Sequence, residues 1–84
     1  MFYVYILKSK KNGNIYTGYS NDLKRRLIEH NSGHNVSTKP YIPYELIYYE
    51  AYRSEGDAKE REQHLKINYR TAVQLKNRLK RSLA

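Results

Sequence analysis

The feature that most restricts the fold is a hairpin at the start of the chain. Residues 2–8 (FYVYILK) are rich in β-forming side chains and alternate between two apolar faces. Asn12 and Gly13 follow, and both tolerate the positive φ that a tight turn requires. Residues 14–19 (NIYTGY) then supply the returning strand. The first strand is predicted to place Phe2, Val4 and Ile6 on one face and Tyr3, Tyr5 and Leu7 on the other.

The register of this hairpin decides how far apart two of its tyrosines lie. Any antiparallel pairing in which opposed residue numbers have an odd sum places Tyr5 and Tyr16 on the same face. A two-residue turn at Asn12-Gly13 would pair Ser9 with Tyr16, leaving Tyr5 roughly 13 Å away along the strand. The two hydroxyls can meet only if the loop is longer than that turn or contains a bulge. The sequence leaves both registers open.

The next segment predicts a helix, a loop and a third strand. A run of candidate N-caps, Ser20-Asn21-Asp22, precedes a helix over roughly residues 22–32, which Gly33 ends. Residues 34–43 contain both prolines of the chain and several polar side chains, a composition typical of a surface loop. Residues 44–52 (YELIYYEAY) are apolar enough for a strand that is central in the sheet or covered on both faces.

Helices account for the rest of the chain. Ser54 can cap a helix over residues 55–69, and Thr71 with Gln74 forms a capping box for a last helix over about residues 72–82. The order is therefore β-β-α-β-α-α, and 84 residues are too few to divide into two units that each bury a core. We expect one α+β domain over residues 1–84, with a three-stranded antiparallel sheet flanked by helices.

The first helix carries polar side chains beside its apolar stripe. Leu23 and Leu27 define the inward stripe, and Arg26 and His30 fall at its margin while Arg25 points outward. A charged group at the margin of the core is unfavourable unless it is paired or binds a ligand. Alternatively, the aliphatic stem of Arg26 covers the core while its guanidinium reaches water. His30 is explained equally well as a residue whose ring nitrogens bond within the fold.

The second predicted helix also carries a charged side chain on its apolar face, in this case an acidic one. Ala58, Leu65 and Tyr69 share a face, and Glu62 lies in the middle of it. A carboxylate on such a stripe is unfavourable unless it pairs with a cation or binds a metal. An ion pair with an arginine at the domain edge is the plain structural explanation. Taken together, Arg26 and Glu62, one cationic and one anionic side chain beside an apolar stripe, indicate a site that binds phosphate and metal.

The overall charge points to polyanionic partners. Sixteen Lys and Arg residues against eight Asp and Glu give a formal net charge of +8, which creates a positive potential over so small a surface. The lack of cysteine excludes disulfides and thiolate metal sites. The apolar residues at the start lack the basic segment of a signal peptide and the length of a membrane span. We therefore expect a cytoplasmic protein that does not bind membranes.

Four motifs in the same order resemble one known family. Tyr3-Val4-Tyr5 and Tyr16-Thr17-Gly18 look like paired strand motifs, and they are followed by Arg26 with His30 four residues on, and then by Glu62. This pattern, over residues 3–70, resembles the GIY-YIG nuclease superfamily. It is most similar to small single-domain bacterial members and to the N-terminal domain of the excinuclease-type members. The chain departs from the family pattern at Tyr3, Val4 and Thr17, and it has no counterpart of a late asparagine found in larger members.

The resemblance implies metal-dependent hydrolysis of phosphodiester bonds. Glu62 would hold one Mg²⁺ or Mn²⁺ ion, and the forked guanidinium of Arg26 would clamp the phosphate. Tyr16 is the preferred general base by this resemblance, while Tyr5 would orient the attacking water or share that role. Because the pKa of a free tyrosine is about 10, the arginine and the cation would have to stabilise the phenolate. His30 would bond a tyrosine or the phosphate.

Basic residues outside this site are candidates for phosphate contacts that carry no sequence information. They are Lys8, Lys10, Lys11, Arg25, Lys39, Lys66, Arg70, Lys76 and Lys80. We expect a monomer or weak dimer that recognises a structure, such as an end, branch, flap or single strand, in DNA rather than RNA. The alternative is a non-catalytic nucleic-acid-binding module with the same fold and charge. A third interpretation is a protein-interaction domain whose basic face meets an acidic partner.

Overall fold

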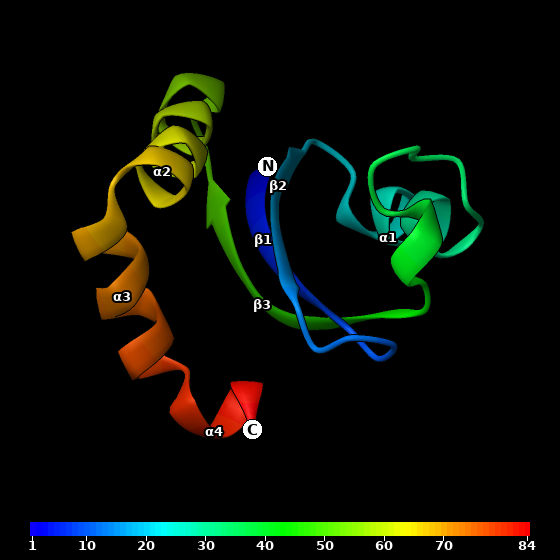
Figure 1. Cartoon of the computed structure of the whole chain (residues 1–84). Coiled ribbons are helices and arrows are strands. Elements are labelled where there is room, and N and C mark those ends of the chain that lie inside the picture. The colour runs from blue at the N-terminus through cyan, green and yellow to red at the C-terminus, as the bar shows by residue number, and fades with distance from the viewer.

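A computed structural model describes residues 1–84 of the chain (Figure 1). Its strands are β1 (Phe2–Ser9), β2 (Ile15–Ser20) and β3 (Tyr44–Tyr52), which form one antiparallel sheet in the order β2-β1-β3. Its helices are α1 (Leu23–Asn31), α2 (Glu55–Ile67), α3 (Tyr69–Arg78) and the short α4 (Lys80–Leu83), and a 3-10 turn spans Lys39–Tyr41. Figure 1 shows α1 on one side of the sheet and α2 to α4 on the other. The predicted α+β architecture is confirmed.

The central strand β1 is buried on both of its faces. Val4 and Ile6 point into the larger core, which they share with α2 and α3 through Ala58, Leu65, Leu75 and Leu79. Tyr5 and Leu7 point into a smaller core on the α1 side, where Tyr44, Leu23 and Leu27 pack against them. The alternation predicted for this strand is therefore present. Because β1 lies between β2 and β3 and carries side chains into both cores, its position fixes the two helical layers relative to each other.

The hairpin loop is longer than the minimal turn. Residues 10–14 connect the strands, so Leu7 pairs with Tyr16 and Tyr5 pairs with Gly18. Ser9 stabilises this loop, because its Oγ accepts hydrogen bonds from the amides of Lys11 and Asn12 at 3.1 and 3.2 Å. Tyr16 consequently lies diagonally across from Tyr5 on the same face, at the separation where aromatic side chains reach each other. The register with the longer loop, one of the two that the sequence left open, is the one that forms.

Side-chain hydrogen bonds fix both ends of α1. Asp22 is the N-cap, and its carboxylate accepts from the amide of Arg25 at 3.1 Å. At the other end Asn31 bridges to the start of β3, since its amide group donates to the carbonyl of Tyr44 and accepts from the amide of Tyr44. Gly33 follows with a φ of 79°, a conformation that suits the end of a helix. These bonds hold the face of α1 that bears Arg26 against the sheet.

An ion pair anchors α2 to β3. Arg61 donates from Nε and Nη2 to both carboxylate oxygens of Glu50, at 2.9 and 3.0 Å for the shorter contacts, and the hydroxyls of Tyr48 and Tyr52 donate to the same carboxylate. Burial alone would raise the pKa of Glu50, but the hydrogen bonds from Arg61, Tyr48 and Tyr52 outweigh it and lower the pKa. The position of α2 along the sheet is set by this contact.

The ends of the last helices differ from the prediction. α2 stops at Ile67 rather than Tyr69, and Asn68 then caps α3 by accepting from the amide of Thr71 at 3.1 Å. The capping box predicted at Thr71 is therefore wrong, because an asparagine three residues earlier satisfies the free amide first. Tyr69 is 84% exposed instead of lying on the core face. None of the helices has the length and apolar character needed to cross a bilayer.

Candidate active site

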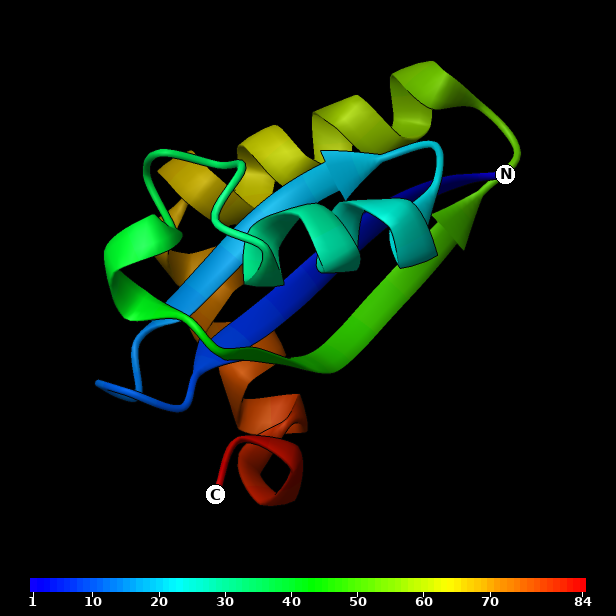
Figure 2. The same cartoon turned by 90° about the vertical axis from the view of Figure 1, so that its right-hand side faces the viewer.

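The five residues predicted to be catalytic come from three parts of the fold and lie around the β2 edge of the sheet. Tyr5 and Tyr16 come from the hairpin, Arg26 and His30 from α1, and Glu62 from α2. Figure 2 shows β2 running between α1 and α2, and α2 packs against both β1 and β2. The imidazole centroid of His30 lies 4.9 Å from the ring of Tyr16 and 5.9 Å from that of Tyr5, and the two phenols are 6.4 Å apart.

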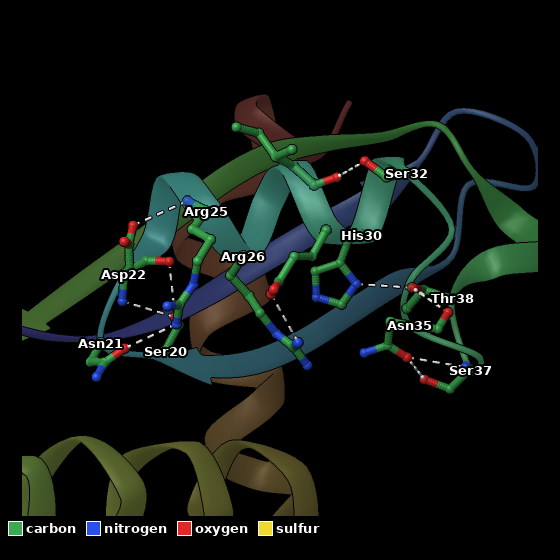
Figure 3. A network of polar contacts seen from close by, with 12 residues as sticks. Ser20, Asn21, Asp22, Arg25, Arg26, His30, Ser32, Asn35, Ser37 and Thr38 are labelled. Atoms are coloured by element: carbon green, nitrogen blue, oxygen red, sulfur yellow. Dashed lines mark hydrogen bonds and ion pairs between the residues drawn. The ribbon is translucent and has the colours of Figure 1, made fainter.

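A chain of buried hydrogen bonds passes through His30. The hydroxyl of Tyr5 lies 2.9 Å from Nε2 of His30. The other ring nitrogen, Nδ1, lies 2.9 Å from Oγ1 of Thr38 (Figure 3). All three side chains are at most 1% exposed. His30 is thus a buried residue whose two ring nitrogens both have protein partners, one on the sheet and one in the loop after α1.

Burial keeps this pair of titratable groups uncharged. Desolvation raises the pKa of Tyr5 to about 12, an effect that Arg26 only partly opposes. Burial, and next to it the charge of Arg26, lower the pKa of His30. Both shifts favour a neutral phenol beside a neutral imidazole at pH 7. In the free protein Tyr5 is therefore a neutral phenol rather than a phenolate.

Gly18 makes room for the ring of Tyr5. A Cβ atom at position 18 would lie 2.4 Å from both Cζ and the hydroxyl oxygen of Tyr5, much closer than such atoms can approach. The phenol of Tyr5 consequently crosses directly over the β2 backbone at the residue it pairs with. A glycine inside a strand often marks such a close approach. This is the physical reason for a glycine two residues after Tyr16.

Arg26 lies beside the hydroxyl of Tyr5. Hydrogen bonding with Tyr5 is the largest of the effects that raise the pKa of Arg26, so the guanidinium stays charged. It also makes a long contact of 3.4 Å with Glu29, and both of those side chains are about one-third exposed, at 33% and 34%. Figure 3 shows Arg26 and His30 extending from the same side of α1. The structure thus gives Arg26 a buried partner on one side and leaves part of its guanidinium open to solvent.

An open cleft begins at this exposed part of Arg26. It runs between the start of α1 and the start of α2, and its lining is almost entirely polar. The lining residues are Tyr19, Ser20, Asn21, Arg25, Arg26, Glu29 and Glu55. The hydroxyl of Tyr19 donates to Glu55 at 2.7 Å across the cleft. A ligand that reaches Arg26 from solvent can enter by this path.

Tyr16 and Glu62 are less deeply placed than Tyr5. Tyr16 is only partly buried, and the ammonium of Lys66 lies 5.8 Å from its ring centroid. The same ammonium forms an ion pair with Glu62 at 3.2 Å, one helical turn away on α2. The side chain of Glu62 keeps 22% of its surface exposed. The predicted arginine partner of Glu62 is wrong, because Arg61 is committed to Glu50 and Lys66 takes its place.

The residues at this edge fit a hard divalent cation only in part. No group of three or more acidic, histidine or cysteine side chains is arranged to enclose a metal. Glu62 is a single carboxylate, which suits an ion such as Mg²⁺ that keeps several waters and takes its other ligands from a phosphate. Since Lys66 now pairs with Glu62, a cation would have to displace that ammonium. Glu62 is the residue that would hold the metal.

The basic residues proposed for binding are spread over several surfaces. Most of them are exposed: Lys10, Lys11, Arg25, Lys39, Lys66, Arg70, Lys76 and Lys80. Lys8 differs, because it is half-buried and its ammonium donates to the carbonyl of Leu83, which ties the end of the chain to β1. Lys11 also donates to a backbone carbonyl, that of Pro40, at 3.1 Å. Lys8 thus has a structural partner that the sequence did not reveal.

Two residues of the site were not singled out from the sequence as functional. Gly18 was noted only as part of a motif, although a glycine within a strand pattern is a usable indication of close packing. Thr38 had no such indication, because it lies in a polar loop and reaches His30 only through the fold. Loop residues that bond to a buried histidine are visible only once the path of the chain is known.

The geometry agrees with what comparison with known proteins finds. Residues 1–80 match the family model described as the GIY-YIG catalytic domain. The chain belongs to the GIY-YIG family. The strand motifs that name this family are here Tyr3-Val4-Tyr5 and Tyr16-Thr17-Gly18, the two segments that pair at the site.

Small bacterial proteins of the same kind resemble this GIY-YIG domain along most of their length. A UPF0213 protein of Staphylococcus saprophyticus is 40% identical over 65 residues, which cover 76% of this chain and 78% of that protein. A UPF0213 protein of Streptococcus agalactiae is 39% identical over 71 residues, covering 83% and 80%. The solution NMR structure of a UPF0213 protein from Bacillus halodurans superposes with a TM-score of 0.55 at 37% identity, covering 89% of this chain and 82% of that one.

Proposed function

We propose that this chain hydrolyses phosphodiester bonds in nucleic acids, using one Mg²⁺ or Mn²⁺ ion, and that it selects the structure of its substrate rather than a base sequence. The observation that carries the proposal is the convergence of Tyr5, Tyr16, Arg26 and His30 with the carboxylate of Glu62 at one sheet edge. The family match supports the class of reaction. The net charge of +8 supports a polyanionic substrate.

Arg26 is the residue that binds the scissile phosphate. Its guanidinium is near the hydroxyl of Tyr5 and is also open to the polar cleft, so two N–H groups can face two phosphate oxygens. Glu29 contacts Arg26 only at 3.4 Å and is partly exposed, so a phosphate can replace it at little expense of free energy. Arg26 therefore neutralises charge that develops on the phosphorus oxygens.

The two tyrosines take different parts because they lie at different depths. Tyr5 is 1% exposed and its hydroxyl is hydrogen-bonded to Nε2 of His30, so we assign it to positioning the imidazole rather than to taking a proton. Tyr16 is partly exposed beside Lys66 and is the hydroxyl that a substrate can reach. We assign Tyr16 as the group that accepts the proton of the attacking water.

Glu62 is the residue that would bind the metal. A divalent ion there supplies Lewis-acid stabilisation of the phosphate and of the leaving oxygen. Lys66 leaves the carboxylate when the ion binds, and its ammonium is then free to contact a flanking phosphate. One lysine therefore serves as the partner of Glu62 in the free protein and as a nucleic-acid contact in the complex.

The Lys66–Glu62 ion pair also favours a second candidate function. A carboxylate that is already neutralised by an ammonium at 3.2 Å does not need a metal, which is the state expected of a domain that binds nucleic acid without cutting it. Such a module would bind through its exposed lysines and arginines with a steep salt dependence. The two functions differ in turnover, not in affinity.

Cleavage of a labelled substrate panel separates them. Single-stranded, duplex, flapped and branched DNA and RNA are incubated with Mg²⁺, Mn²⁺ or EDTA, using the parent chain, Glu62→Ala and the control Glu60→Ala. Glu60 lies on the same helix but is exposed. Metal-dependent cutting of a structured DNA that is lost only in Glu62→Ala supports the nuclease. Binding without cutting in all three proteins establishes the binding module instead.

A further inference from the structure

Thr38 is a buried polar side chain to which the proposed reaction gives no role. It lies in the loop between α1 and β3, is 1% exposed, and its Oγ1 is 2.9 Å from Nδ1 of His30. We propose that Thr38 is a positioning residue that fixes the tautomer of His30, so that Nε2 stays unprotonated and accepts the hydroxyl proton of Tyr5. The loop after α1 then becomes part of the site through Thr38, which acts on the imidazole and not on the substrate.

Counting the available protons identifies this tautomer. A threonine hydroxyl has one proton to donate, and in the proposed arrangement that proton goes to the carbonyl of Asn35, 3.4 Å away. Oγ1 is then free to accept, so the partner atom Nδ1 of His30 carries the ring proton. A neutral imidazole has a single N–H, so Nε2 is an acceptor and the hydroxyl of Tyr5 must donate to it.

The opposite tautomer leaves a buried group without a partner. If Nε2 carried the proton it would donate to the oxygen of Tyr5, and the hydroxyl proton of Tyr5 would have no acceptor in a site that is 1% exposed. Thr38 would also have to turn its proton from the carbonyl of Asn35 to Nδ1. Unpaired buried donors are unfavourable and rare.

The loop is built to hold Thr38 in this place. The carbonyl of Asn35 accepts from the amides of Thr38 and Lys39 at 3.2 and 2.9 Å, and the side-chain oxygen of Asn35 accepts from the amide of Ser37 at 3.1 Å. These bonds form a tight turn around Asn35, visible at the right of Figure 3. The turn points Oγ1 of Thr38 at the imidazole and leaves the neighbouring hydroxyl of Ser37 exposed.

The charged and titratable groups around the imidazole do not supply another partner for Nδ1. They are Arg26 and Glu29 on its own helix, Tyr5 on β1, Tyr16 on β2 and Tyr44 on β3. The tyrosines of β2 and β3 face His30 with their rings at 4.9 and 6.2 Å between centroids. Thr38 is therefore the residue on which the orientation of the proton depends.

The expected effect on turnover rests on the proposed function, because the tautomer acts through Tyr5 on Arg26. The tautomer of the His30 ring does not depend on that function. The test is a nitrogen-15 NMR spectrum of the histidines at pH 7, recorded for the parent, Thr38→Val, Thr38→Ser and the control Ser37→Ala. Only three histidines are present, and His30 is the buried one, so its signals are assigned easily. Cleavage kinetics are measured on the same four proteins.

We expect the parent and Thr38→Ser to carry the proton on Nδ1 of His30, and Thr38→Val to shift toward the Nε2–H form. Turnover should fall roughly 10-fold to 100-fold in Thr38→Val with little change in KM, and Thr38→Ser should restore it. A parent protein with the proton on Nε2 overturns the proposal, even if Thr38→Val does not fold. An unchanged ring in a folded Thr38→Val overturns it as well. If the parent cuts nothing the proposed function fails, while the spectra still decide the tautomer.

Discussion

Adding one methyl group at Gly18 should be among the most damaging small changes in this protein. The new Cβ would lie 2.4 Å from Cζ and the hydroxyl oxygen of Tyr5, so the phenol has to move. Displacing a packed ring costs about 1–3 kcal/mol as overpacking. Losing the 2.9 Å bond to His30 adds about 1–3 kcal/mol, since a buried imidazole nitrogen is left unpaired. We therefore expect Gly18→Ala to destabilise the fold by about 2–6 kcal/mol.

That loss is large for a chain of 84 residues, whose total stability is on the order of 4–13 kcal/mol. Urea denaturation followed by circular dichroism measures it directly, and Tm should fall by roughly 10 °C or more. Gly56→Ala is the matched control, because a Cβ there meets only the hydroxyl of Ser54 at an ordinary 3.6 Å. It lies in the first turn of α2, so that change should be neutral or stabilising.

This explanation requires that the Cβ added at position 18 clashes with the side chain of Tyr5. A double-mutant cycle with Tyr5→Leu tests this, because leucine ends before the position of the clashing atoms. In the Tyr5→Leu background, Gly18→Ala should have almost no further effect on stability. A full loss of about 2 kcal/mol or more in both backgrounds would refute the explanation, as would a Gly18→Ala protein with the stability of the parent.

Three further outcomes follow from the same structure. Tyr5→Phe should lower stability by about 1–3 kcal/mol in urea titrations, whereas Tyr16→Phe should change it little, because only the first hydroxyl serves a buried nitrogen. The pKa of Glu50 is lowered in the folded state, so its contribution is present above about pH 4.5, its unperturbed pKa, and is lost as the pH falls through the folded pKa. Glu50→Gln should remove that part of the pH dependence of the free energy of unfolding between about pH 6 and pH 3. The same loss of stability on acidification in Glu50→Gln as in the parent would contradict this explanation. Binding of DNA, measured by fluorescence anisotropy, should weaken steeply between about 50 and 200 mM salt, and a flat response would exclude phosphate contacts as its basis.

Local patterns in the sequence predict a large part of this architecture. The alternation in residues 2–8 assigns Val4 and Ile6 to one core and Tyr5 and Leu7 to the other, as observed. The helical spacing of Arg26 and His30 places both beside the Leu23–Leu27 stripe, and that is where they lie. Periodicity succeeds here because each of these elements buries one face against the sheet.

Features that depend on contacts between distant segments were not predictable in this way. The hairpin register is set by Ser9 accepting the loop amides, and two registers fit the same strand pattern. Arg61 of α2 pairs with Glu50 of β3, a contact that helical spacing alone does not reveal. The boundary between the last two helices depends on which of several polar residues caps first, and Asn68 does so. Local propensity is nearly the same for the competing choices, so tertiary contacts decide them.

Depth in the fold separates two tyrosines that the sequence presents as equivalent. Burial raises the pKa of Tyr5 to about 12, and burial and Arg26 lower the pKa of His30, so both shifts oppose moving the proton from the phenol to the imidazole. A group with that penalty is poorly suited to accept a proton during catalysis, but it is well suited to hold Arg26 in a fixed place. Tyr16 stands on the same face, one diagonal step toward solvent, without that hydrogen-bonded partner. If the proposed function holds, Tyr5→Phe should lower stability more than Tyr16→Phe does, and Tyr16→Phe should lower turnover more than Tyr5→Phe does.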